Sequence, residues 1–315
     1  MNRKEKVLSK ISKSGRGLEI GASFAPFAPK RDGYQTHVID HLAKEDLIEK
    51  YRAHDMPVEN VETVDFVWKG ESYAELTGNR NYYDWIIASH LIEHTPDLIG
   101  FINSCQEVLK DDGVLSLVVP DARFCFDSLR PLSGISKIID AHIQGDKLHT
   151  VGTITEFALN AVRKNGSFDW NEKKAGNDSY SFSHTSEESN KMIEAAEKKK
   201  AYVDAHCWCF TPTSFRLLIH DLNALGFIDL KEVEIFPTEG CEFFITLAKN
   251  GESADLDRMA CLKKIREESW VDVSLRDLIK KRVADKIRFG IFRFRNSLKY
   301  RLSFLKKPAN LKVER

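Results

Sequence analysis

The chain has 315 residues, of which 42% are hydrophobic and 30% are charged, a composition that excludes a globally disordered protein. Its 47 basic and 47 acidic side chains cancel, but residues 276–315 carry 14 basic against 3 acidic side chains, which puts a net charge of −11 on residues 1–275. Because a nucleic-acid surface needs a basic face, this neutral-to-acidic body excludes broad nucleic-acid binding.

The six cysteines form no pattern that would indicate a disulfide framework. Residues 1–13 are polar and basic, without the apolar segment of a secretion signal. No run approaches the ~20 apolar residues that span a membrane. We therefore expect a cytoplasmic protein.

Short apolar runs alternate with helical segments over the first 120 residues. The runs predict strands at residues 17–20, 36–39, 61–68, 83–89 and 114–119. The segments between them predict helices at residues 1–14, 41–53, 71–76 and 96–109, the last ending at residues 110–113. Repeated strand–helix units imply a parallel sheet with helices on both faces, and such a sheet binds ligands at the carboxyl ends of its strands.

Residues 122–204 have a different composition and read as a helical insertion that forms a lid. They contain helical pieces at 135–141 and 154–162, then a polar run that ends in a surface helix at 187–200. After the insertion, Thr211 is placed to cap a helix over residues 213–225 that has Pro212 at its first position. Residues 227–236 and 242–249 predict an antiparallel hairpin that closes the sheet.

The composition shifts again after residue 251. Apolar side chains recur at every third or fourth position from Leu275 to Leu305 among many basic ones, which predicts an amphipathic helix with a basic face. Such a helix fits a membrane surface or a partner protein, and the alternative is a helix folded back on the domain. We therefore expect a domain over residues 1–250, with its insertion at 122–204, and a basic helical extension over 251–315.

The turn after the first predicted strand has one glycine where a dinucleotide-binding turn has three. Gly21 is followed by Ala22-Ser23-Phe24-Ala25-Pro26, so the close backbone approach that a pyrophosphate needs is missing. This counts against a nicotinamide cofactor and favours a nucleoside ligand without phosphates, of which S-adenosylmethionine is the common one. Asp40, at the end of the second strand, can accept hydrogen bonds from two ribose hydroxyls or cap a turn. Glu19 is either a buried acid that organises the turn and the ligand's amino-acid end, or an exposed edge residue.

Four motifs, at residues 18–21, 38–40, 83–94 and 108–115, resemble the successive motifs of class I S-adenosylmethionine-dependent methyltransferases. Pro26 and residues 89–94, 119–123 and 208–212 resemble, more narrowly, a bacterial branch found among cell-surface polysaccharide and glycosyltransferase genes. The chain departs from the commoner pattern at Ala22-Ser23. The resemblance spans about residues 15–120 and 211–249. It implies a Rossmann-like, mostly parallel sheet with an antiparallel closing hairpin, and S-adenosylmethionine as cofactor.

The candidate site residues follow from this arrangement of strand ends. Those predicted to bind the cofactor are Glu19, Gly21, Asp40, Asp65 and Ser89. Methyl transfer to a hydroxyl is helped by a base that takes its proton, and the residues predicted to be catalytic are His90, His94 and Asp121. Those predicted to bind the acceptor are Glu93, Arg123, His206 and Trp208. Two alternatives stay open: Glu93 and His94 cap the next helix, and Asp121 pairs with Arg123 in a salt bridge.

The run His206-Cys207-Trp208-Cys209 lacks the second ligand pair that a zinc site would need, so we predict no metal there; a divalent metal, as some O-methyltransferases use, stays open as an alternative because its Asp ligands need no local motif. The resulting hypothesis is an enzyme that uses S-adenosylmethionine to O-methylate a sugar hydroxyl of a surface polysaccharide or its precursor. Its alternative is a non-catalytic module of the same fold in a glycan assembly complex. The basic tail would contact a glycosyltransferase or the inner face of the membrane.

Overall fold

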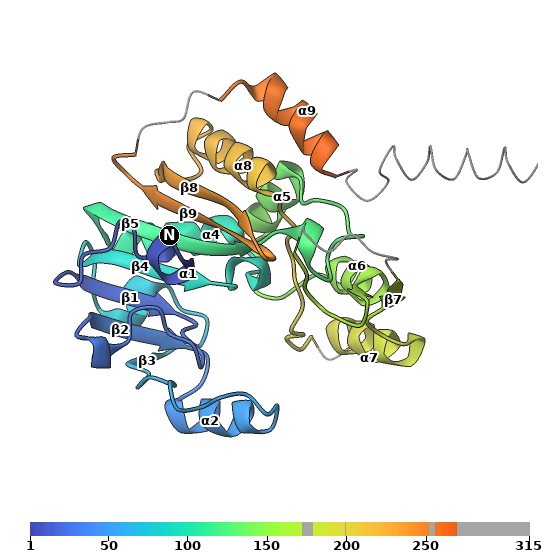
Figure 1. Ribbon diagram of the computed structural model, residues 1–315, viewed down its shortest axis with the longest axis horizontal. Helices are drawn as coiled ribbons and strands as arrows, with labels where there is room; N and C mark the ends of the chain where they lie inside the picture. Colours follow the sequence, from blue (N-terminus) through green and yellow to red (C-terminus); the bar gives the residue numbers. More distant parts are fainter. Residues whose placement is uncertain (172–178, 199, 252–255, 270–315) are drawn as a thin grey trace, which may run out of the picture. The chain divides into compact units, whose positions relative to one another are not determined.

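A seven-stranded sheet in the order β3-β2-β1-β4-β5-β9-β8 is the centre of this computed structural model, which describes residues 1–171, 179–198, 200–251 and 256–269 (Figure 1). The first five strands pair in parallel, whereas β9 runs antiparallel to both β5 and β8. The Rossmann-like sheet with an antiparallel closing hairpin is thereby confirmed. Its strands are β1 (Arg16–Ile20), β2 (Gln35–Asp40), β3 (Phe66–Val67), β4 (Tyr83–Ser89), β5 (Leu109–Pro120), β8 (Lys231–Glu239) and β9 (Glu242–Ala248).

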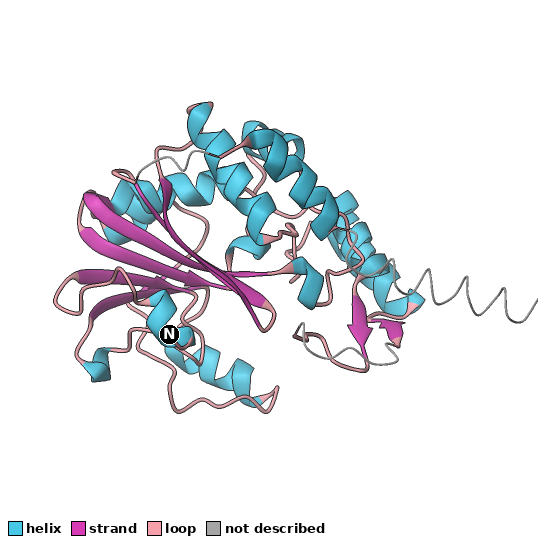
Figure 2. Ribbon diagram, turned by 45° about the horizontal axis from the view of Figure 1, so that its top comes forward, coloured by secondary structure: helices cyan, strands magenta, loops and turns pink. Residues whose placement is uncertain are grey.

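Helices cover the two faces of the sheet unequally, as Figure 2 shows. Because side chains alternate along a strand, Ile86 of β4 faces one core and Trp85 faces the other. The larger core is shared with α3, α4, α5 and α8, and the smaller one with α1. The helices are α1 (Arg3–Val7), α2 (Lys44–Arg52), α3 (Tyr73–Thr77), α4 (Leu98–Val108), α5 (Ile135–Gln144), α6 (Val151–Asn160), α7 (Ser186–Glu197), α8 (Pro212–Ala224) and α9 (Arg258–Glu268).

The smaller core is completed by a loop rather than by a helix. Residues 21–34, all described, contain only a short 3-10 turn, and Phe27 and Ala28 from this loop fill the space beside Trp85. Trp85 lies flat over Gly17, where an added Cβ would come within 1.9 Å of the indole ring. Because this loop is compact, the turn after β1 stays close to the carboxyl ends of β1 and β2.

The insertion forms a small subdomain of its own. Its helices α6 and α7 pack around Ile154 and Phe157, and a two-stranded hairpin of β6 (Val162–Lys164) and β7 (Tyr180–Phe182) lies beside them (Figure 1). Only α5 belongs to the main core, through Ile138 and Ala141. The surface helix predicted at 187–200 is confirmed as α7.

Several predicted boundaries are wrong. The helix predicted over residues 1–14 ends at Val7, because residues 8–15 form successive turns. The strand predicted over 61–68 is only β3, since only Phe66 and Val67 pair with β2. Residues 110–113 are part of β5 rather than a helix end, and the strand predicted at 227 begins at Lys231 after a turn. The β6–β7 hairpin was not predicted, since each of its strands has only 3 residues, too few for a pattern to stand out in polar sequence.

Residues 256–269 are attached to the main domain through α9. The carboxylate of Glu268 is buried and accepts hydrogen bonds from the hydroxyls of Thr211 (2.6 Å) and Thr213 (2.8 Å) at the start of α8. Thr211 caps α8 as predicted. The predicted amphipathic helix from Leu275 to Leu305 lies outside the described residues. In the described part of the chain, no helix has both the length and the hydrophobicity needed to cross a bilayer.

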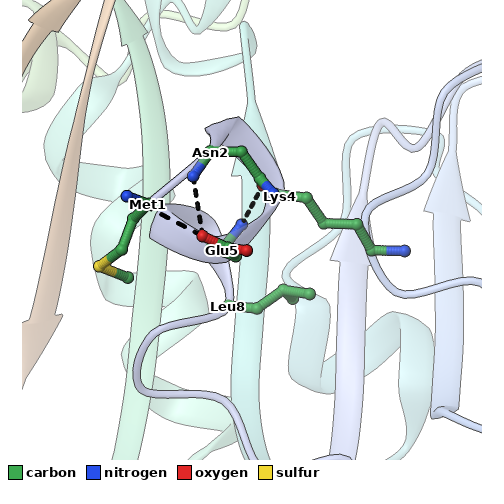
Figure 3. A pocket seen from close by; sticks show the side chains of 5 residues that line it. All are labelled: Met1, Asn2, Lys4, Glu5 and Leu8. Carbon is green, nitrogen blue, oxygen red and sulfur yellow. Dashed lines mark hydrogen bonds and ion pairs between the residues drawn. The ribbon is translucent and has the colours of Figure 1, made fainter.

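A shallow hollow of about 590 Å³ opens beside α1 (Figure 3). It is lined by Met1, Asn2, Lys4, Glu5 and Leu8. Its one carboxylate, Glu5, is already engaged in capping α1 through the backbone N–H of Asn2 (2.8 Å). The hollow therefore offers no chemistry comparable to that at the carboxyl ends of the strands.

Candidate active site at the carboxyl ends of the strands

The turn after β1 has the left-handed backbone that its glycine permits. Gly21 has a φ of +67°, its N–H donates to the carbonyl of Ile39 (2.8 Å), and an added Cβ would lie 2.8 Å from Leu91. Ser23, two residues on, also has a positive φ of 56° and donates its hydroxyl to Tyr51 (2.7 Å). Two left-handed residues thus shape the turn that the sequence marked with a single glycine.

Glu19 holds this turn in place. Its carboxylate accepts hydrogen bonds from the backbone N–H groups of Phe27 (2.7 Å) and Ala28 (3.1 Å), and its side chain is buried. Burial raises the pKa of Glu19 to about 7, against the opposing effect of these two hydrogen bonds. The turn-organising half of the prediction matches this geometry, whereas its contact with a cofactor stays a prediction.

Asp40 lies beside the turn at the end of β2. Its Oδ1 accepts from the N–H of His41 (2.8 Å) and lies 2.6 Å from that residue's Nδ1, while Oδ2 accepts only a long 3.4 Å bond from the N–H of Ser23. One oxygen of this buried carboxylate therefore keeps capacity for a further donor.

The Asp65 carboxylate is bonded to other residues of the chain rather than to the turn after β1. Its Oδ2 accepts from Lys30 (2.6 Å) and from the backbone N–H of Val38 (2.7 Å) in the middle of β2. This fastens the segment before β3 to β2, so the predicted cofactor role of Asp65 has no support from its geometry and stays a prediction.

Ser89 and His90 end β4 next to a network of charges. His90 has a left-handed φ of 48°, and its Nε2 lies 2.7 Å from Glu242 at the start of β9. Arg3 of α1 donates to the same Glu242 carboxylate (2.9 Å) and lies 3.5 Å from the Ser89 hydroxyl. Burial would lower the pKa of His90, but the hydrogen bond with Glu242 and the charges of Glu93 and Glu242 outweigh it and raise that pKa.

The fold then brings two adjacent predicted residues, Glu93 and His94, together with a third, His206, from a distant part of the sequence. Glu93 and His94 lie on a 3-10 turn (Ile92–His94) after β4. The segment that carries His206 is fastened to that turn, because the N–H of Cys207 donates to the backbone carbonyl of Glu93 (2.6 Å). As a result the rings of His94 and His206 meet edge to face at 4.7 Å.

Carboxylates flank both rings of this cluster. Asp127 lies 2.5 Å from Nδ1 of the buried His206 and is itself fixed by the buried Arg130 (2.6 Å). Asp204 lies 3.0 Å from Nδ1 of His94. Burial would raise the pKa of Asp127, but the charges and hydrogen bonds of His206 and Arg130 outweigh it and lower that pKa. The hydrogen bond with His94 is the main reason that the pKa of Asp204 falls to about 2.

Asp121 and Arg123 pair with each other, which is the alternative that the sequence left open. Asp121 is fully buried and accepts from Arg123 (2.6 Å) and from the Thr238 hydroxyl (2.5 Å). Trp208 is only 2% exposed and donates its indole N–H to the carbonyl of Thr95 (2.7 Å). Asp121 presents no free surface for its predicted catalytic role, whereas Trp208 presents only a small part of its side chain, and both roles stay predictions.

A cleft of about 250 Å³ adjoins the segment that carries His206. Cys207 and Trp208 line it, and its other walls come from α5, the start of α6 and the segment between them. Polar side chains on these walls can meet hydroxyl groups; they are Ser136, Lys137, Asp140, Gln144, Asp146, His149, Thr150 and Thr153.

The sequence did not predict Asp127, Arg130 or Asp204 as site residues. A signal for the first two is the charged pair three residues apart in an otherwise apolar stretch. A signal for Asp204 is its place two residues before His206, where an extended chain puts both side chains on one side.

Comparison with known proteins agrees with this geometry. A family model described as a methyltransferase domain matches residues 2–224. No curated protein matches the sequence.

Three of the solved structures that are similar to the chain share its fold at low sequence identity. The trans-methyltransferase CalH in complex with SAH is 12% identical, with 77% of this chain and 53% of that chain covered and a TM-score of 0.37. A Rhodobacter sphaeroides protein named as a Zn-dependent alcohol dehydrogenase is 16% identical, with 79% and 89% covered and a TM-score of 0.39. A SAM-dependent methyltransferase from Aquifex aeolicus is 13% identical, with 78% and 88% covered and a TM-score of 0.35. The chain spans about half the length of the first of these proteins.

S-adenosylmethionine fits the residues at the turn. Gly21 lets the backbone turn beside the ligand edge, and Asp40 keeps one oxygen for a ribose hydroxyl, while the single glycine offers no pyrophosphate cradle. Glu19 can act only indirectly in this arrangement, through the loop that it holds. With the family model matching residues 2–224, the chain belongs to the methyltransferase domain family.

Proposed function

We propose that this methyltransferase O-methylates a sugar hydroxyl of a surface polysaccharide or its precursor. The observation that carries the proposal is the group of imidazoles and carboxylates directly after β4, at the same sheet edge as Gly21 and Asp40. A hydroxyl needs a proton acceptor, and the imidazoles at this edge can supply one. The sugar class is supported by the resemblance of residues 89–94, 119–123 and 208–212 to the polysaccharide-associated branch.

S-adenosylmethionine, when bound, supplies an electrophilic methyl group. The chain itself has to hold this ligand at the carboxyl ends of the strands. We assign that role to Asp40, the Gly21 turn and Ser89. In-line displacement depends mainly on alignment, which a rigid sheet edge provides.

His90 is the residue that we propose to accept the acceptor's proton. Its ring is the most exposed of the histidines near Glu93, with 38% of the side chain accessible. Glu242 fixes the ring through Nε2 at 2.7 Å, which leaves Nδ1 directed toward the space beside Glu93 at 3.6 Å. A fixed and accessible imidazole at a strand end has the geometry of a general base.

The 250 Å³ cleft is the proposed acceptor site. Its carboxylates, hydroxyls and one lysine suit the many hydroxyls of a sugar, and the segment carrying His206 joins it to the imidazole group. We further propose that the basic tail contacts a glycosyltransferase or the inner face of the membrane.

Surface glycans from cells that make the wild-type chain or its His90→Ala variant test the proposal. We expect an O-methylated sugar in the mass spectrum with wild type and its unmethylated form with the variant. His220→Ala, on α8 and away from these strand ends, is the matched control and should keep the methylated sugar. Identical glycans with and without the wild-type gene would contradict the sugar assignment.

A further inference from the structure

Glu93 has a carboxylate with no hydrogen-bond donor among the described residues. Its side chain is 0% exposed, and neither Oε1 nor Oε2 accepts a hydrogen bond. The ring nitrogens of His90, His206 and His94 lie 3.6, 3.9 and 4.0 Å from Oε1, beyond normal hydrogen-bond distance. Because a buried ionised carboxylate without a partner is costly, this geometry calls for a cationic ligand.

Two imidazoles converge on the same point. One ligand atom each from Glu93, His94 and His206 lie within 4.8 Å of one another. These come from two separate segments that the backbone hydrogen bond between Cys207 and Glu93 holds together. The convergence is therefore built into the fold rather than a matter of loose surface side chains.

Each imidazole is also oriented from behind. Asp127 lies 2.5 Å from Nδ1 of His206, and Asp204 lies 3.0 Å from Nδ1 of His94. At His206 this hydrogen bond keeps the proton on Nδ1 and leaves the lone pair of Nε2 facing Glu93, whereas Asp204 stands at ion-pair distance from Nδ1 of His94 without a well-directed hydrogen bond. Histidines that bind metals almost always donate their other ring N–H to a carboxylate, a backbone carbonyl or water. The buried Arg130 holds Asp127 in turn, so Arg130 and Asp127 together fix the ring of His206.

We propose that Glu93, His94 and His206 bind a divalent transition-metal ion through one carboxylate oxygen and two imidazole nitrogens. This donor set suits zinc, cobalt, iron(II) or manganese, whereas calcium and magnesium prefer oxygen ligands alone. In four-coordinate sites with bonds of ~2.0–2.2 Å the ligand atoms stand ~3.3–3.5 Å apart, so the 3.9 and 4.0 Å separations close with small side-chain movements.

Three protein ligands leave an open position, as in catalytic rather than structural metal sites. The role of that position rests on the proposed function: it would take the acceptor hydroxyl, and a Lewis acid there lowers the pKa of the hydroxyl. The sequence predicted no metal because it offered only the close pair Cys207 and Cys209. The ligand set instead combines adjacent residues with a partner more than a hundred positions away.

Titration of the full chain, purified without a histidine tag, with Co²⁺ tests the site. We expect one visible-absorbing Co²⁺ per chain and a higher Tm with the ion present. Glu93→Gln and His206→Ala, which remove ligands, should weaken Co²⁺ binding at least ~100-fold, and Asp127→Asn, which loses only the carboxylate behind His206, by ~10–100-fold.

His142→Ala is the matched control. His142 also lies 3.0 Å from a carboxylate, that of Asp97, but belongs to no such cluster, so its loss should leave Co²⁺ binding unchanged. If His206→Ala fails to fold, His94→Ala, whose side chain is 29% exposed, takes its place.

Absence of Co²⁺, Zn²⁺ and Mn²⁺ binding by the folded wild-type chain would overturn the inference, and so would unchanged binding by Glu93→Gln. Co²⁺ binding without methylated sugar would leave the metal site standing and remove only the sugar proposal. Methylated sugar without metal binding would leave the sugar proposal standing and remove only the metal site.

Discussion

Glu19 and Glu93 are two buried glutamates at the same edge of one sheet, and they differ in what surrounds their oxygens. Glu19 accepts two backbone hydrogen bonds, from Phe27 and Ala28, and so closes a loop onto the sheet. Glu93 accepts none, although its side chain is less exposed (0% against 3%). The first carboxylate stabilises the chain itself, and the second is kept for a ligand.

The same contrast separates two halves of this sheet edge: the first half is the Gly21 turn with Asp40, and the second half is the turn after β4. Around the Gly21 turn, most polar groups are engaged within the chain, and Asp40 keeps only part of one oxygen free. Around the turn after β4, three imidazoles face the Glu93 carboxylate at 3.6–4.0 Å without closing a hydrogen bond to it. We infer that the first half positions the methyl donor and that the second half acts on the acceptor.

The largest expected effect comes from removing the proposed base of the second half. His90→Ala should lower kcat for methyl transfer by ~10²–10⁴-fold, because the acceptor proton loses its acceptor. S-adenosylhomocysteine affinity, measured by calorimetry, should stay within about twofold of wild type. A variant with full activity would show that His90 is only structural.

Glu19→Ala tests the first half of the edge, where the carboxylate stabilises the loop. It leaves the N–H groups of Phe27 and Ala28 buried without an acceptor, and we expect the free energy of unfolding to fall by about 2–4 kcal/mol. Chemical denaturation at neutral pH measures this. A loss below about 1 kcal/mol would mean that the loop is not held by this carboxylate.

Glu242 gives a pH-dependent test at the border of the two halves. Burial would raise its pKa, but the hydrogen bonds of His90 and Arg3 outweigh burial and lower the pKa to about 2. A carboxylate with a lowered folded-state pKa stabilises the fold above its ordinary pKa near 4.5, and this contribution is lost as the pH falls toward 2.

Glu242→Gln should therefore destabilise the chain by about 2–3 kcal/mol at pH 7 and hardly at all near pH 2. Denaturation of both proteins at several pH values measures the difference. A difference that does not change with pH would show that the variant acts through packing alone.

Glu93→Gln should behave in the opposite way to Glu19→Ala. In the presence of a chelator it replaces a buried carboxylate that accepts no hydrogen bond among the described residues, so the free energy of unfolding should stay within about 1 kcal/mol of wild type. Denaturation under the same conditions as for Glu19→Ala provides the comparison. Equal destabilisation by the two substitutions would erase the distinction between the two glutamates.

Much of the fold could be predicted from the sequence because its strands are short apolar runs with clear ends. Residues 83–89 matched β4 at both ends, and Thr211 caps α8 as its position before Pro212 indicated. The strand over 61–68 was overestimated because β pairing, rather than hydrophobicity, decides where a strand stops.

The site could be predicted only in part. Glu93 and His94 were candidates because they follow a strand end, and His206 because of its motif; the structure brings the three together, while their predicted roles stay predictions. Asp127 and Asp204 reach the cluster through tertiary packing of the insertion, which no local pattern encodes. The saturation of Asp121 by Arg123 likewise depends on contacts that spacing alone left as one of two alternatives.

Calorimetric titration of the purified chain with S-adenosylhomocysteine tests the central claim most directly. The account predicts one binding site per chain, with the affinity lowered ~10-fold or more in Asp40→Ala because ribose hydrogen bonds are lost. No binding by the folded wild-type chain, or equal affinity in both proteins, would contradict the donor site described at the ends of β1 and β2.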